Sequence, residues 1–290
     1  MSIVTVLLVV LAAVIHATWN LLAKRAADVG AAFVFAYTLL GCVVYAPWVV
    51  WILWRDGMPW SLAVLLCIVL SGVLHLGYNL SLQRGYQVAD LSVVYPVARG
   101  TGPAVATVGA IVLLGEPAGA NALVGVGAVV IGIVLIAARG RWSRFKQSQA
   151  LAGIRWGAAS GVLIASYSVV DAYGVKVLLI APVVLDWCAH MVRLGLLLPW
   201  AIAQRQHTQR AMKGYWVLAL LVGTLSPMSY ILVLVALSEG APLSVVAPVR
   251  EMSMMIGAVL AVVILHEPMD RGRLVGCVLL TLGVVLLVLS

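Results

Sequence analysis

The sequence predicts an all-α integral membrane protein with ten transmembrane helices, arranged as two inverted five-helix repeats around a central cavity. The chain is 64% hydrophobic and only 10% charged, with a mean hydropathy of +1.12, whereas soluble domains carry about 25% charged residues. Apolar runs of about 20 residues recur along it, each long enough to cross roughly 30 Å of hydrocarbon as a helix. The two halves of the chain also resemble each other.

The apolar runs define ten predicted spans. They are continuous, whereas strands of a membrane β-barrel would show segments of about ten residues with alternating hydrophobicity. The first run resembles the core of a signal peptide, but no Lys or Arg precedes Lys24, so we expect a retained first helix. The predicted spans are residues 3–23, 31–54, 61–83, 90–114, 118–138, 153–176, 181–203, 214–237, 242–265 and 271–289.

An internal repeat divides the chain into two halves of five spans each. A basic linker, residues 139–152, separates a first repeat at 1–138 from a second at 153–290. One residue is lost in the second copy: if the gap falls directly after Pro248, Arg99 pairs with Arg250, and otherwise it pairs with Glu251. Offsets of 152 and then 151 residues align Lys24 with Lys176, Tyr78 with Tyr230, Pro96 with Pro248, Glu116 with Glu267, and Gly132 with Gly283.

The loop charges predict the orientation in the membrane. Every Lys and Arg in the predicted loops and their flanks, except Arg55 and Lys176, belongs to a loop after an odd-numbered span. Positive loops stay in the cytoplasm, which places both termini outside it and the protein in a bacterial-type inner membrane. The net charge of +8 therefore reflects topology and gives no sign of a nucleic-acid partner. Because five is odd, the second repeat enters from the opposite side.

Polar residues inside the predicted spans are the candidates for a substrate-binding cavity. Such side chains are costly in a membrane unless they face protein, water or a ligand. Pro96 and Pro248 precede two of them and predict helix breaks, because proline leaves a backbone carbonyl without its donor. The candidate cavity residues are His16, Trp19, Asn20, His75, Tyr78, Asn79, Arg99, His190, Arg193, Tyr230, Arg250 and Glu251.

The roles of these residues remain open at this point. Three intramembrane arginines are balanced by Asp171, Asp186 and Glu251, which fits either buried ion pairs or a site for a zwitterion. The histidines fit hydrogen-bonded interior residues or a proton relay, and Asp171 fits a loop. No His, Cys or carboxylate set has metal-ligand spacing, so we expect no metal and no cofactor. The Glu-Pro pairs at 116–117 and 267–268 are interpreted as turns, with no catalytic role.

The chain resembles the EamA-type branch of the drug/metabolite transporter superfamily. The resemblance rests on ten spans in two halves, a lysine that closes the first helix of each half, and Leu-Gly-Glu-Pro at 114–117 matched by Leu-His-Glu-Pro at 265–268. It implies ten helices around a central cavity lined by helices one, three, four, six, eight and nine. By resemblance, the residues facing that cavity are Asn20, Asn79, Arg99, Tyr230 and Arg250.

This combination predicts a secondary transporter that works by alternating access and is not an enzyme. Its substrate would be a small polar or zwitterionic metabolite such as an amino acid, moved in the export direction. Membrane lipid surrounds the protein, and protons are a candidate coupling ion. One alternative is a lipid-conjugate flippase of the same superfamily. Another is a membrane-embedded enzyme, which would need a cluster of acids or a nucleophile–base pair that the sequence does not display.

Overall fold

The computed structural model describes residues 2–26, 29–89, 91–117, 119–138, 150–265 and 270–289. Ten of its helices are long and apolar enough to cross a membrane, as predicted. Most of the basic linker and the Glu267-Pro268 turn lie outside the described residues. The helices are α1 (Ile3–Lys24), α2 (Ala31–Asp56), α3 (Leu62–Val88), α4 (Leu91–Leu114), α5 (Ala120–Ala138), α6 (Ala150–Lys176), α7 (Pro182–Ala203), α8 (Arg205–Ala211), α9 (Trp216–Ser238), α10 (Leu243–Arg250), α11 (Met252–Leu265) and α12 (Arg271–Leu289).

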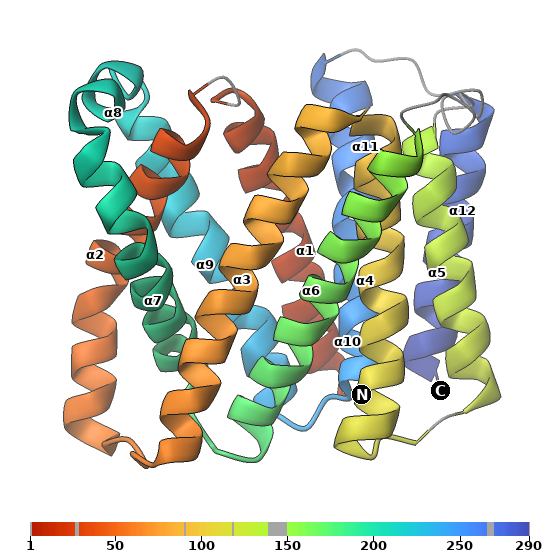
Figure 1. The fold of residues 1–290 in the computed structure, drawn as a ribbon. Helices are drawn as coiled ribbons and strands as arrows, with labels where there is room; N and C mark the ends of the chain where they lie inside the picture. Colours follow the sequence, from red (N-terminus) through yellow and green to blue (C-terminus); the bar gives the residue numbers. More distant parts are fainter. Residues whose placement is uncertain are drawn as a thin grey trace.

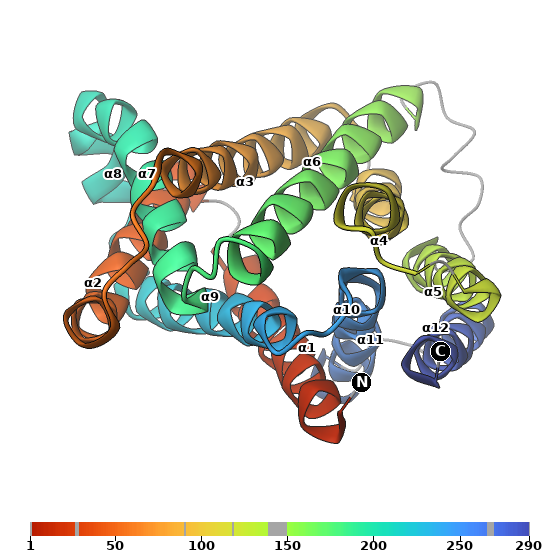
Figure 2. The same cartoon turned by 90° about the horizontal axis from the view of Figure 1, so that it is seen from below.

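The two halves are inverted relative to each other. In Figure 1, α1 rises from the lower face while α6, the first helix of the second half, descends from the upper face, and both termini lie at the lower face. The ends of α1, α3 and α7, which precede predicted basic loops, lie at the upper face. Seen from below, α5 and α12 lie together at one end of the bundle, and α2, α7 and α8 at the other (Figure 2).

Glycines allow α5 and α12 to pack closely against each other. A Cβ atom at Gly132 would lie 2.8 Å from the Gly276 carbonyl oxygen, and one at Gly125 would lie 3.0 Å from that of Gly283. Membrane helices associate through this kind of close packing, because lipid tails remove the hydrophobic drive that operates in water. Large apolar side chains such as Leu7 and Leu282 remain exposed on the outside, where lipid would cover them.

The predicted ninth span is broken into α10 and α11, with Glu251 at the break. Pro248 lies in the last turn of α10 and cannot donate to the Ser244 carbonyl, which instead accepts a hydrogen bond from Thr107 Oγ1 at 3.3 Å. Pro96, in contrast, lies inside the continuous helix α4. The predicted break at Pro96 is therefore wrong, and the two matched prolines have different local effects.

Candidate functional site

A cavity of about 100 Å³ lies at the middle of the bundle, between the two halves. Of the twelve predicted cavity residues, ten line it, and Asn20 and Glu251 do not. Asn20 donates instead to the His16 carbonyl of its own helix, at 2.8 Å, and the Glu251 carboxylate is buried behind the cavity wall. The lining residues are Ala12, His16, Trp19, Tyr37, His75, Tyr78, Asn79, Arg99, Tyr167, Asp186, His190, Arg193, Ser226, Ser229, Tyr230 and Arg250.

Sequence reasoning left several of these lining residues out of the candidate set. Tyr167 precedes Asp171 by four residues on α6, and Ser226 and Ser229 precede Tyr230 by four and one on α9. Residues three or four apart share a helix face, so the spacing that identified the other candidates could also have found Tyr167 and Ser226. Tyr37 has no such neighbour and gave no signal.

Arg99 is paired with a buried acid from the other repeat. Its Nη1 donates to both carboxylate oxygens of Glu251 at 3.2 Å, and the Glu251 residue is completely buried. Its Nη2 lies 2.7 Å from His16 Nε2. Because a guanidinium only donates, His16 Nε2 must accept, and the neutral ring carries its proton on Nδ1. Arg99 therefore ties α4 to α1 and to the break between α10 and α11.

Arg250, the neighbour of Glu251, is differently placed. It is 5% exposed and lines the cavity, and its only ionic contact among the described residues is a long one, Nε to Glu251 Oε1 at 3.7 Å. No described residue accepts a hydrogen bond from Nε. A buried charge without a hydrogen-bonded partner is costly, so the cavity beside Arg250 is suited to an anion.

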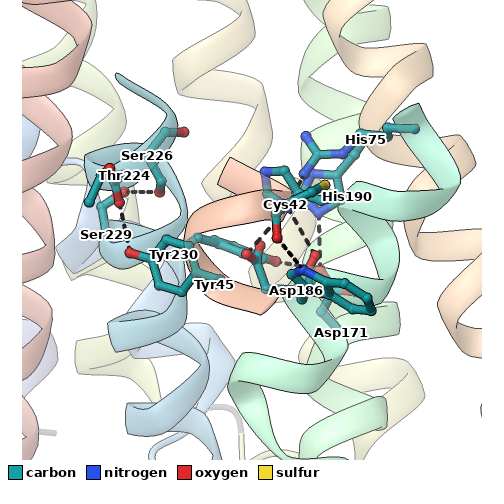
Figure 3. A network of polar contacts seen from close by, with 12 residues as sticks. Cys42, Tyr45, His75, Asp171, Asp186, His190, Thr224, Ser226, Ser229 and Tyr230 are labelled. Atoms are coloured by element: carbon teal, nitrogen blue, oxygen red, sulfur yellow. Dashed lines mark hydrogen bonds and ion pairs between the residues drawn. The ribbon is translucent and has the colours of Figure 1, made fainter. Parts of the chain in front are cut away.

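Asp171 contacts a cluster of ring side chains that includes His75 and Tyr230 (Figure 3). Its Oδ2 accepts from the Tyr230 hydroxyl at 2.6 Å and lies 3.1 Å from His75 Nε2. The His75 ring stacks on Tyr167, with ring centroids 3.8 Å apart. Asp171 is 1% exposed inside α6, so the loop alternative is wrong, and its Oδ1 has no partner among the described residues.

A second acid–histidine group, labelled in part in Figure 3, lies on α7. His190 Nδ1 is 2.6 Å from Arg193 Nη2, 2.9 Å from the Asp186 backbone carbonyl oxygen and 3.3 Å from Asp186 Oδ2. One ring nitrogen cannot accept from Arg193 and donate to Asp186 at the same time. Since the guanidinium always donates, neutral His190 accepts from Arg193, and a proton on Nδ1 would exchange that partner for Asp186.

The described residues include no group of three His, Cys, Asp or Glu side chains that could hold a metal ion. Cys42 and Cys67 are buried singly, with free thiols. What the cavity offers is a fixed set of charges and aromatic faces: one cation without a close partner, two acid–histidine groups and four tyrosines. This set can bind a small charged molecule and exchange protons with it.

The model of the EamA-like transporter family matches residues 3–138 and 151–289, which is nearly the whole chain in two units. No curated protein matches the sequence. A solved crystal structure shares the fold with a TM-score of 0.74, and the alignment covers 98% of this chain and 97% of the other at 15% sequence identity. At that identity, the likeness establishes the fold alone.

Proposed function

Because the chain belongs to the EamA-like transporter family, we propose that it is a secondary transporter for a small metabolite with an anionic group, such as an amino acid or related zwitterion. The observation that carries the proposal is Arg250, which is buried at the cavity and whose one ionic contact among the described residues is a long one to Glu251. A carboxylate in the cavity would supply the missing partner. Arginine is suited to this role because its planar fork can hold both carboxylate oxygens.

Cavity size and charge narrow the substrate class further. A volume of about 100 Å³ is smaller than the roughly 300–1,000 Å³ of pockets for drug-sized ligands, which favours a small metabolite as the substrate in this conformation. The intramembrane charges balance when the histidines are neutral. A zwitterion leaves that balance unchanged, whereas a monoanion adds net charge at a depth where charge is costly. The balanced groups are Arg99, Arg193 and Arg250 against Asp171, Asp186 and Glu251.

The inverted repeats, 1–138 and 153–290, support alternating access. In transporters built this way, the two repeats move against each other around a site near the midplane, and Arg250 and Arg99 both line the cavity between the repeats. The basic loops orient the upper face of Figure 1 toward the cytoplasm. We propose location in the inner membrane with both termini outside the cytoplasm, and transport in the export direction.

The test uses purified protein reconstituted in liposomes, with alanine and lactate as matched probes. Alanine carries an ammonium group where lactate carries a hydroxyl, so the pair compares a zwitterion with a monoanion of nearly equal size. We expect alanine to be carried and to raise the melting temperature. Arg250→Gln should abolish both effects and Arg250→Lys should weaken them, while the exposed Arg205→Gln serves as the control. Undiminished alanine transport by Arg250→Gln would contradict the proposal.

We further propose protons as the coupling ion, with His190 as the group that binds them. Neutral His190 holds Arg193 at 2.6 Å, and protonated His190 would bind Asp186 and release the Arg193 guanidinium toward the cavity. Proton binding would thus add a free cation to the site and favour an anionic substrate. Titratable groups facing this trio from other helices are Tyr37, Cys42 and Tyr45 on α2 and His75 on α3.

This coupling is tested by following the lumenal pH of liposomes with a trapped dye while lactate or alanine is added. We expect proton movement with alanine to depend on His190 and to be lost in His190→Gln. The surface histidine of α8 provides the control variant, His207→Gln. Equal proton movement in His190→Gln and the parent protein would show that another group binds the coupled proton. Asp171 and His75 are then the next candidates to replace.

A further inference from the structure

Glu116, in the turn after α4, makes four contacts to the second repeat. Its Oε1 accepts from the Leu243 backbone N–H at 2.6 Å and from Lys176 Nζ at 3.1 Å. Its Oε2 accepts from the Ser244 backbone N–H at 2.9 Å and from the Ser244 hydroxyl at 2.7 Å. A turn residue without a further role would leave its carboxylate in solvent, whereas this carboxylate is 8% exposed.

These contacts supply what the first turn of α10 lacks. The first N–H groups of a helix have no partner within it, and the preceding residue of α10, Pro242, provides no side-chain cap. Glu116, which belongs to the other repeat, acts as the cap of α10. Its negative charge is favourable at the positive end of the helix dipole. Thr107 of α4 fixes the same turn through the Ser244 carbonyl.

The short length of α10 transmits this anchoring to the cavity. The helix has eight residues, all of them buried, and at 1.5 Å per residue it is about 12 Å long. Leu243 and Ser244 begin it and Arg250 ends it. Because the helix ends at Glu251 directly afterwards, the position of the Arg250 side chain depends on how the first turn of α10 is held.

We propose that Glu116 is a positioning residue that closes the lower face of Figure 1 and sets the position of Arg250. The inference rests on the transport function proposed above. The Glu116 carboxylate joins the ends of α4, α6 and α10 at that face, so these ends separate only when its bonds to Leu243 and Ser244 break. The sequence repeats the Glu-Pro pair at 267–268 and the lysine at position 24, but the closing role is proposed for Glu116 alone.

The test measures distances by pulsed electron paramagnetic resonance on full-length protein in nanodiscs. Spin labels at Asn121 and Ser238, both exposed, report the separation of the α4–α5 and α9–α10 turns. We expect a single short-distance population in the labelled parent and a second, longer population in Glu116→Gln, which loses the charge. Glu239→Gln makes the same chemical change on an exposed neighbour of α10 and should match the parent.

Ser244→Ala and acidification of the parent test the same contacts without Glu116→Gln, which could fold poorly. Ser244→Ala removes one donor and leaves both backbone bonds, so we expect a smaller shift toward the longer population. The labelled parent should open as acid protonates Glu116. In transport, Glu116→Gln should raise KM for alanine several-fold while Glu116→Asp restores part of it. Unchanged distances in all three conditions would overturn the closing role, whether or not Arg250 binds the substrate. If Arg250→Gln abolishes transport but Glu116→Gln leaves KM unchanged, the positioning role is overturned.

Discussion

Replacing Arg99 by Gln should destabilise the folded protein strongly, whereas the same replacement of Arg250 should not. The two arginines follow matched prolines and are both about 5% exposed, so their sequence context predicts equal effects. Their partners differ. Arg99 holds the buried Glu251 through two hydrogen bonds at 3.2 Å, while Arg250 has one contact at 3.7 Å.

The magnitude follows from the charge that each change leaves behind. Arg99→Gln leaves Glu251 as a buried anion, and breaking a buried pair in this way costs about 3–5 kcal/mol. Arg250→Gln removes a buried cation that no described residue holds closely, so the free energy of unfolding should change by less than about 1 kcal/mol or increase. The double variant Arg99→Gln/Glu251→Gln removes both charges and should lose less stability than the sum of the two single changes.

Equilibrium unfolding in mixed micelles, followed by circular dichroism, measures these differences. A loss of about 4 kcal/mol lowers the folded-to-unfolded ratio by nearly a thousandfold, which such a titration resolves. Alanine-induced stabilisation is recorded in parallel and should disappear in Arg250→Gln. Equal destabilisation by both single changes would refute the assignment of a structural role to Arg99 and a binding role to Arg250.

Three further outcomes are expected. Burial raises the pKa of the Glu116 carboxyl, but hydrogen bonds from Ser244 and Leu243 and the nearby Lys176 outweigh burial and hold that pKa below its usual range. The stabilisation that the Glu116 carboxylate gives is therefore complete at neutral pH and is lost as pH falls through the lowered pKa. Melting temperatures of the parent and Glu116→Gln should converge in acid. Gly132→Ala should cost about 1–3 kcal/mol by overpacking, while Gly127→Ala, with nothing within 4 Å of its new Cβ, should be neutral or stabilising in thermal unfolding. A protease-cleavable tag after residue 290 should be cut from outside the cell, and protection there would reverse the orientation.

The ten spans and their inversion could be predicted because membrane helices are specified locally, by the length of an apolar run and the charge of its flanking loops. Helix α8, with seven residues, is too short for that signal and was missed. The break in the ninth span was expected at Pro248 and occurs at Glu251, because a proline in a last helical turn loses only one bond.

Side-chain partners could not be predicted, because they depend on helix packing. The sequence placed arginines at matched positions but held no information that Arg99 faces Glu251 and His16 while Arg250 faces the cavity. Asp171 was ambiguous for the same reason: the predicted span already reached residue 176, but only the packing of α6 shows that the carboxylate contacts Tyr230 and His75. The Glu116 turn was recognised, but its contact with Leu243 crosses 127 residues of sequence.

The glycine contact between α5 and α12 follows the rule of a twofold-symmetric dimer interface. Gly132 meets Gly276, and Gly125 meets Gly283. The repeat offset equates Gly125 with Gly276 and Gly132 with Gly283, so a twofold rotation converts each contact into the other. In a homodimer of half-length chains, every substitution would appear on both sides of the axis. Joining the halves in one chain removes that constraint, and one arginine can then be committed to a buried acid while its counterpart stays available to the cavity.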